Sequence, residues 1–189
     1  MSVFFNAYFI KTQEPESKLK ERFWRVDIFP ESKWAVCNFG DDYEDGMFEP
    51  GTYFTQEISE QFGEAIFIGV DTRNDQLDYE HSKAGIILRK LCWCTDGCQS
   101  TWGWVEGEKE AWEDAAIFSE ENFARAREMV KYGEHLELLP EEEFLAKEKE
   151  LRSIWDNRQY ILGDTWPLGD ASFNGAIEEY FGLKVPPRF

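Results

Sequence analysis

The sequence contains no long hydrophobic run, no secretion signal and few cysteines. No stretch approaches the roughly 18 apolar residues that a membrane-spanning helix requires. The N-terminus "MSVFFNAYFIK" lacks the basic leader, the long apolar segment and the small-residue cleavage site of a signal peptide. We therefore expect a cytoplasmic protein with no membrane partner, whose four cysteines are reduced.

Basic side chains are also scarce. The chain has 20 Lys and Arg against 38 Asp and Glu, a net charge of −18. This charge repels the phosphates of nucleic acids, so direct nucleic-acid binding is not expected and a basic protein is the favoured partner. Two segments carry nearly all of the excess: residues 41–64, which contain no Lys or Arg, have a net charge of −8, and residues 106–150 have a net charge of −9.

Aromatic residues are abundant enough to fill a substantial core. The 189 residues include 16 Phe, 8 Trp and 7 Tyr, so the acidic residues are expected to lie on a folded body and not in a disordered tail. We expect a single α+β domain spanning 1–189, strand-rich over 1–106 and helix-rich over 107–189. Its mostly antiparallel sheet, from the N-terminal half, should pack against helices from the C-terminal half.

Hydrophobic periodicity and capping residues locate the expected elements. Apolar or alternating runs predict strands at 2–11, 22–29, 33–39, 65–70, 84–94 and 100–107. Helices are expected at 56–62, 108–118, 120–133, 141–160 and 174–181. Thr55 and Ser119 are the expected N-caps, Gly63 and Gly133 the expected ends, and Pro140 the start of the longest helix. Residues 12–21 are expected to form a polar loop.

Motifs that would indicate an enzyme are missing. The sequence contains no Gly-rich phosphate loop, no H-E-x-x-H, no G-x-S-x-G and no dinucleotide fingerprint. His81 is expected in a polar loop and His135 near a helix end, where histidines ordinarily have surface or capping roles. We therefore expect a protein that is not an enzyme and that needs no cofactor.

The cysteines leave one alternative open. In "CWCTDGC", Cys92 and Cys94 are two apart in a predicted strand and share a face, and Cys98 follows just past the turn. Together with Cys37 or His81 they could form a tetrahedral zinc site, which would make the protein a small metal-dependent enzyme. The spacing lacks the paired C-x2-C of zinc knuckles, and buried free cysteine commonly behaves as a small hydrophobic residue.

The two acidic segments provide the candidate binding residues. We expect a partner-binding surface formed by acidic residues with nearby tryptophans as aromatic anchors. The acidic candidates are Asp41, Asp42, Glu44, Asp45, Glu49, Glu106, Glu108, Glu110, Glu113 and Asp114, and the aromatic candidates are Trp102, Trp104 and Trp112. The competing interpretations are that the acids serve solubility alone and that most tryptophans fill the core.

Three phrases resemble a known family. "GEAIFIGVDTRND", "STWGWVEGE" and "LGDTWPLGD" resemble the immunity protein 52 family, one of the immunity families of bacterial polymorphic-toxin and type VI secretion systems. The resemblance covers about half of the chain. It implies an α+β protein that binds and neutralises a cognate nuclease toxin with a restriction-endonuclease-like core, without a motif that assigns roles to individual residues.

A DNA mimic is the remaining alternative. An inhibitor of a DNA-binding enzyme would also be strongly acidic, but it would space its carboxylates like phosphates along an elongated face. In a toxin inhibitor the carboxylates would instead be grouped around aromatic residues, and the shape of the acidic surface distinguishes the two.

Overall fold

The protein has an α+β fold built on one antiparallel sheet. The computed structural model describes residues 3–40, 53–96, 99–132 and 137–187. Seven strands form the sheet in the order β2-β3-β1-β4-β5-β6-β7, and every neighbouring pair is antiparallel. They are β1 (Phe4–Lys11), β2 (Val26–Ile28), β3 (Ala35–Gly40), β4 (Glu64–Asp71), β5 (Gln76–Lys83), β6 (Ile86–Asp96) and β7 (Gln99–Gly107). This confirms the predicted fold class.

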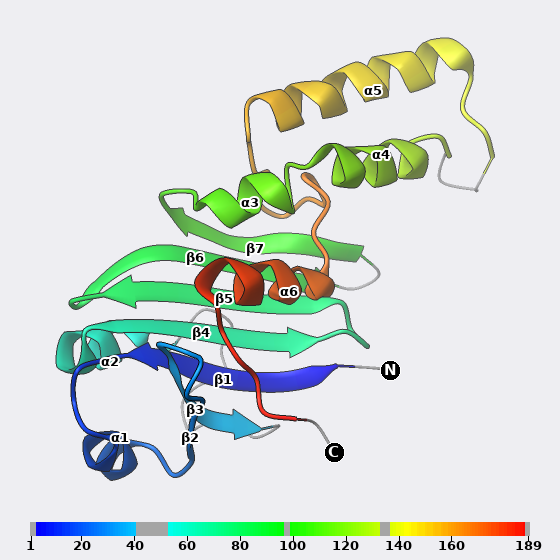
Figure 1. Cartoon of the computed structure of the whole chain (residues 1–189). Helices are drawn as coiled ribbons and strands as arrows, with labels where there is room; N and C mark the ends of the chain where they lie inside the picture. The colour runs from blue at the N-terminus through cyan, green and yellow to red at the C-terminus, as the bar shows by residue number, and fades with distance from the viewer. Residues whose placement is uncertain (1–2, 41–52, 97–98, 133–136, 188–189) are drawn as a thin grey trace.

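Helices cover both faces of the sheet. The described helices are α1 (Glu16–Arg22), α2 (Thr55–Phe62), α3 (Ala111–Ala115), α4 (Glu120–Met129), α5 (Glu141–Asp156), α6 (Asn174–Phe181) and the 3₁₀ helix η1 (Ala171–Phe173). Helix α6 lies in front of the sheet in Figure 1, α1 and α2 lie toward the β1 side, and α4 and α5 project beyond β7. None of these helices combines the length and the apolar composition needed to cross a membrane.

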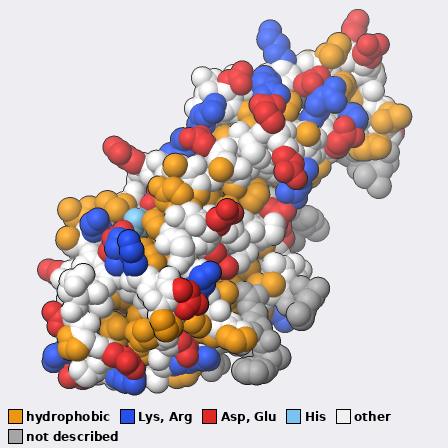
Figure 2. Space-filling view, viewed as in Figure 1, with side chains coloured by type: hydrophobic (Ala, Val, Ile, Leu, Met, Phe, Trp, Pro, Cys, Tyr) orange, Lys and Arg blue, Asp and Glu red, His pale blue; other side chains and the backbone are white. Residues whose placement is uncertain are grey.

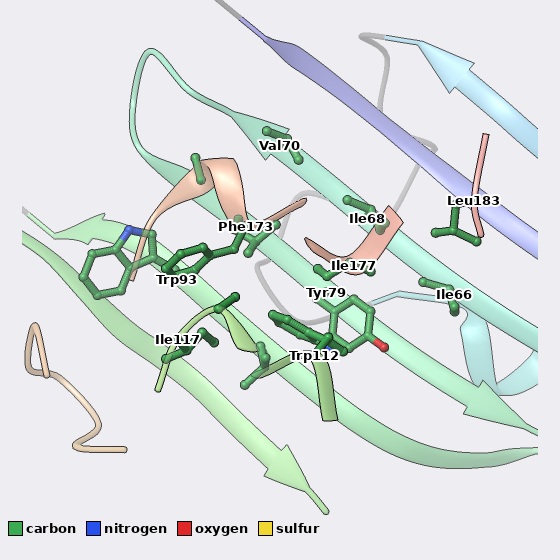
Figure 3. Close-up of a cluster of buried hydrophobic side chains, with 14 of the residues drawn as sticks. Ile66, Ile68, Val70, Tyr79, Trp93, Trp112, Ile117, Phe173, Ile177 and Leu183 are labelled. Atoms are coloured by element: carbon green, nitrogen blue, oxygen red, sulfur yellow. The ribbon is translucent and has the colours of Figure 1, made fainter. Parts of the chain in front are cut away.

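The alternation of side chains along the strands produces two apolar layers. On one face, Ile66, Ile68 and Val70 of β4 point toward η1 and α6, and Trp112 and Ile117 close the same core from the α3 side (Figure 3). On the other face, a smaller cluster includes Phe67, with Leu19 of α1 and Ile58 of α2. Because alternate residues of a strand point to opposite faces, the continuously apolar β4 can contribute to both layers.

Several predicted boundaries are confirmed. Helix α2 ends at Gly63, whose φ of 109° is a conformation that favours glycine. The Oγ of Ser119 caps α4 by accepting a hydrogen bond from the backbone N of Asn122 at 3.1 Å. Pro140 immediately precedes α5, and α6 spans the predicted residues 174–181. The predicted end of α4 at Gly133 is wrong, because the helix ends at Met129; Gly133 itself lies outside the described residues.

Other predictions are wrong. Residues 12–21 contain most of α1, since Leu19 buries into the core and anchors a helix there. Residues 22–29 form only the three-residue β2, and Trp24 is 66% exposed. Thr55 begins α2 but does not cap it, because its hydroxyl bonds to Glu80 and Ser82.

Ion pairs join α4 to α5. The i,i+4 spacing in α5 would pair Glu143 with Lys147 and Glu148 with Arg152. The first pair is present at 3.8 Å, but the second is not. Arg152 instead donates to Glu120 of α4 at 2.7 and 3.0 Å, and Glu148 accepts from Arg127 at 2.5 Å. Figure 2 shows acidic and basic side chains intermixed over these two helices. Within the helix pair, cations therefore balance Glu120, Glu128, Glu143 and Glu148.

Candidate functional site

The segment from the end of β7 into α3 contains Glu106, Glu108, Glu110, Glu113 and Asp114, all of them predicted binding residues. The chain leaves the sheet at Gly107 and enters α3 through a reciprocal capping arrangement, in which the backbone N of Glu110 donates to the carboxylate of Glu113 at 2.8 Å. This turn directs some of the carboxylates into the protein and leaves others on the surface.

Glu113 is fully buried and bound to Arg89. The guanidinium donates from Nε and Nη2 to the two carboxylate oxygens at 2.9 and 2.6 Å, and the hydroxyl of Tyr160 adds a bond of 2.5 Å. Arg89 also donates to the carbonyls of Glu106 and Gly107 at 3.2 and 2.9 Å. Burial by itself would lower the pKa of Arg89, but the bonds to Glu113 outweigh it and raise the pKa. This pair fixes the end of β7 and the start of α3 to β6.

Glu110 is bound by three side chains of the core. It accepts hydrogen bonds from the Tyr79 hydroxyl at 2.5 Å and from the Trp112 indole at 2.9 Å, and its Oε1 lies 2.6 Å from the Nδ1 of His81. The other ring nitrogen of His81 lies 3.2 Å from Glu64. Although burial opposes it, these hydrogen bonds lower the pKa of Glu110. Glu110 therefore joins α3 to β5.

Three of the predicted surface residues are thus corrected to core residues. Glu113 is 0% exposed, Trp102 is 0% exposed and Trp112 is 2% exposed. The Trp102 indole donates to the carbonyl of Pro167 at 2.6 Å, and its ring packs against Trp93 and Tyr160. None of the three can anchor a partner from inside the protein.

Asp114 is exposed but locally balanced. It accepts from Lys109 at 2.6 Å and from Arg158 at 3.2 Å. Partial burial opposes the change, but the two cations lower the pKa of its carboxyl group. Asp114 therefore contributes little unmatched negative charge to this surface.

Trp104, Glu106 and Glu108 remain at the surface. The Trp104 side chain is 39% exposed, with the Nζ of Lys90 5.5 Å from its ring centroid. Glu106 and Glu108 are exposed, and no ion pair involving either occurs within the described ranges. Because β7 ends the strand order, these residues lie along the free edge of the sheet. We call residues 103–108 the β7 edge.

The other acidic candidates cannot be placed. Asp41, Asp42, Glu44, Asp45 and Glu49 lie outside the described residues, as do Cys98 and His135. The predictions for these residues stay predictions.

The described cysteines carry no reactive or metal-binding signature. Cys92 is buried and Cys94 is half-buried on the same face of β6. The neighbouring Cys94 thiol, burial and Asp78 all raise the pKa of Cys92, and burial raises that of Cys37 to about 12. These thiols stay protonated at neutral pH. Within the part of the chain that the structure describes, no group of three His, Cys, Asp or Glu side chains could hold a metal ion.

Strand β5 and the buried side chains that it contributes are not predicted from the sequence. In "QLDYEHSK", Leu77, Tyr79 and His81 enter the larger core, so the prediction of a polar loop around His81 is wrong. The opposite face buries Asp78 and Glu80, and burial raises the pKa of both. Strict alternation was the signal, but the alternating positions are acidic and they face a second layer of protein instead of solvent.

Two hollows flank the α4–α5 pair. One, of about 620 Å³, is lined partly by Phe123, Leu145 and Arg152, and the guanidinium of Arg152 lies 3.4 Å from the centroid of the Phe123 ring. The other, of about 490 Å³, lies between α5 and residues 161–166.

Comparison with known proteins gives no match: no family model, no curated protein and no solved structure is similar to this chain.

Proposed function

We propose that this protein acts in the cytoplasm as an immunity protein, which binds and neutralises a basic nuclease toxin. The observation that carries this proposal is the β7 edge. Glu106 and Glu108 are exposed beside Trp104, while Glu110, Glu113 and Asp114 of the same segment are bound by core or surface partners.

The physical argument is electrostatic. A nuclease presents Lys and Arg along the groove that receives phosphates. Carboxylates that lack an intramolecular cation attract such a groove and accelerate encounter, while a partly exposed indole provides contact area after docking. The net charge of −18 adds a long-range attraction for a basic protein.

Two alternatives receive less support. A DNA mimic needs a row of outward carboxylates, but the third and fourth acids of this segment, Glu110 and Glu113, point into the core. A metal-dependent enzyme built on the cysteines would need Cys92 as a ligand, and its thiol is buried with a raised pKa.

Affinity capture from the native organism, followed by an inhibition assay, tests the proposal. The expected result is a basic protein with nuclease activity that one equivalent of this protein abolishes. Glu106→Lys/Glu108→Lys should weaken the inhibition. Glu14→Lys/Glu31→Lys is a control with the same change of charge, placed near the β2 edge at the other end of the strand order. Capture of a partner that is neither basic nor a nuclease would refute the proposal.

A further inference from the structure

The geometry points to a specific mode of recognition: the β7 edge binds an extended, basic segment of the partner as an additional strand of the sheet. This inference rests on the proposed function for the basic character of the partner. It adds that main-chain hydrogen bonds form the contact and that Glu106 selects its charge.

The first half of strand β7, before the β7 edge, already pairs with residues 162–164 of the chain. The backbone N of Trp102 donates to the carbonyl of Asp164 at 3.1 Å, and the backbone N of Gly163 donates to the carbonyl of Trp102 at 2.8 Å. Leu162 and Trp102 form a parallel bridge. This side of β7 therefore accepts an extended chain at Trp102, and the register shift of the β6–β7 ladder between Trp102 and Trp104 bends the strand just beyond it.

Pairing stops after Trp102. Among the residues that the structure describes, no backbone hydrogen bond joins residues 103–107 to a segment outside the sheet. Gly103, Trp104, Glu106 and Gly107 are exposed and Val105 is half-buried. The carbonyls of Glu106 and Gly107 accept from the Arg89 side chain, so the outward backbone groups of residues 103–105 form the template for another strand. Extended peptides use such groups in β-strand addition.

The charges on the β7 edge select the occupant. Glu106 and Trp104 share one face of the sheet. They pair with Lys90 and Cys92 of β6, which in turn pair with Glu80 and Asp78 on one face of β5. Two copies of this chain that paired edge to edge would bring Glu106 and Glu108 of each copy together, and like charges on paired strands destabilise. A strand with Lys or Arg at alternate positions removes this repulsion.

The nearby cations Lys90 and Lys109 do not neutralise Glu106 and Glu108, so the preference for a basic strand remains. Lys90 lies 3.5 Å from the buried carboxylate of Glu80 and stacks on Trp104. Lys109 is bound to Asp114 at 2.6 Å. Both cations are thus occupied by other groups. An alternating strand that places Lys on the face shared by Glu106 and Trp104, and apolar residues on the face of Val105, has the matching chemistry. The aliphatic stem of a Lys beside Trp104 also covers the indole.

Synthetic peptides test the inference on the intact protein. The probe is a blocked nine-residue peptide of alternating Lys and Val, and its control has Glu in place of Lys. Titration into ¹⁵N-labelled protein should shift the amide resonances of residues 103–107 and slow their hydrogen exchange about tenfold. Equal binding of the Glu peptide, or shifts confined to other elements, would overturn the inference.

Methylated peptides separate strand addition from side-chain docking. In a strand, successive N–H groups point to opposite edges, so N-methylation of all Lys or of all Val residues blocks one edge only. Strand addition predicts that one of these two peptides loses binding at least about tenfold and the other keeps it. Loss in both or in neither would contradict it.

Two protein variants complete the test. Glu106→Lys should weaken binding of the Lys-Val peptide about tenfold, and Glu31→Lys should change it less than about twofold. If a captured basic nuclease is inhibited but the peptides fail, strand addition is wrong and the proposed function stands. If the captured partner is not basic, the proposed function fails whatever the peptides show.

Discussion

The first two carboxylates of residues 106–114 are exposed without an ion pair among the described residues, whereas the last three are bound by other side chains. Glu106 and Glu108 face solvent along the β7 edge, whereas Glu110 and Glu113 are bound by Tyr79, His81 and Arg89, and Asp114 is paired at the surface. All five are carboxylates within one short stretch of the chain. The difference teaches that the negative charge of a segment says little about its surface until the position of each carboxylate is known.

The largest expected effect compares Glu113 with Glu106. Glu113→Ala leaves the Arg89 guanidinium buried without its carboxylate, and breaking a buried ion pair in this way costs about 3–5 kcal/mol in the free energy of unfolding. Glu106→Ala removes the same charge from the surface and should change it by less than about 0.5 kcal/mol. Urea unfolding followed by tryptophan fluorescence measures both. Equal effects would show that the two acids do not differ in this way.

The next comparison uses one buried tryptophan, Trp112, and one partly exposed tryptophan, Trp104. Trp112→Phe removes the indole bond to the buried carboxylate of Glu110 and leaves a small cavity, so it should cost about 1–3 kcal/mol. The half-exposed Trp104 makes no such bond to the core, and Trp104→Phe should cost under about 0.5 kcal/mol. Thermal unfolding of the two variants in parallel distinguishes them, and a larger loss for Trp104→Phe would contradict the assignment.

Two aspartates of the sheet should respond oppositely to pH. Burial raises the pKa of Asp78, so the unfolded chain releases this proton first as the pH rises above about 4. The contribution of Asp78 to the free energy of unfolding therefore falls until its raised folded pKa is passed. Its Oδ1 has no hydrogen-bond partner among the described atoms. Asp78→Asn should stabilise the protein at pH 7 by on the order of 1 kcal/mol, and by less at pH 4.

Asp71 provides the control of opposite sign. Hydrogen bonds from Arg73 lower its pKa to about 2, although burial opposes them. Its contribution to stability is present above the unfolded pKa of about 3.9 and is lost as the pH falls through about 2. Asp71→Asn should therefore destabilise at pH 7, and chemical denaturation across pH 3–8 reports both variants. A gain for Asp71→Asn would invalidate this interpretation of the buried carboxylates.

The smallest expected effect on stability belongs to the outward carboxylates. Glu106→Gln/Glu108→Gln should change the free energy of unfolding by less than about 0.5 kcal/mol. It should nevertheless slow association with a captured basic partner several-fold at low salt and weaken the dependence of that rate on salt. Stopped-flow or biosensor rates, with Glu14→Gln/Glu31→Gln as the control, measure this. An unchanged association rate would remove the β7 edge from the interface.

Much of the fold was predictable because local patterns and tertiary packing agree. The apolar run that became β4, the Ser119 cap of α4 and the Gly63 end of α2 each form from residues close in sequence. The candidate site was less predictable. The exposure of Trp104 and the burial of Trp102 depend on residues 161–168, which cover only the first half of β7.

The sequence by itself determined the fold class, most strands and helices, and the excess of acid from which we propose a basic partner. Only the tertiary structure decided which carboxylates remain available to one. The reason is physical: burying a carboxylate is costly unless hydrogen-bond donors converge on it. The donors to Glu113 come from Arg89 and Tyr160, 24 residues before it and 47 residues after it. No local pattern in the acidic segment records that convergence.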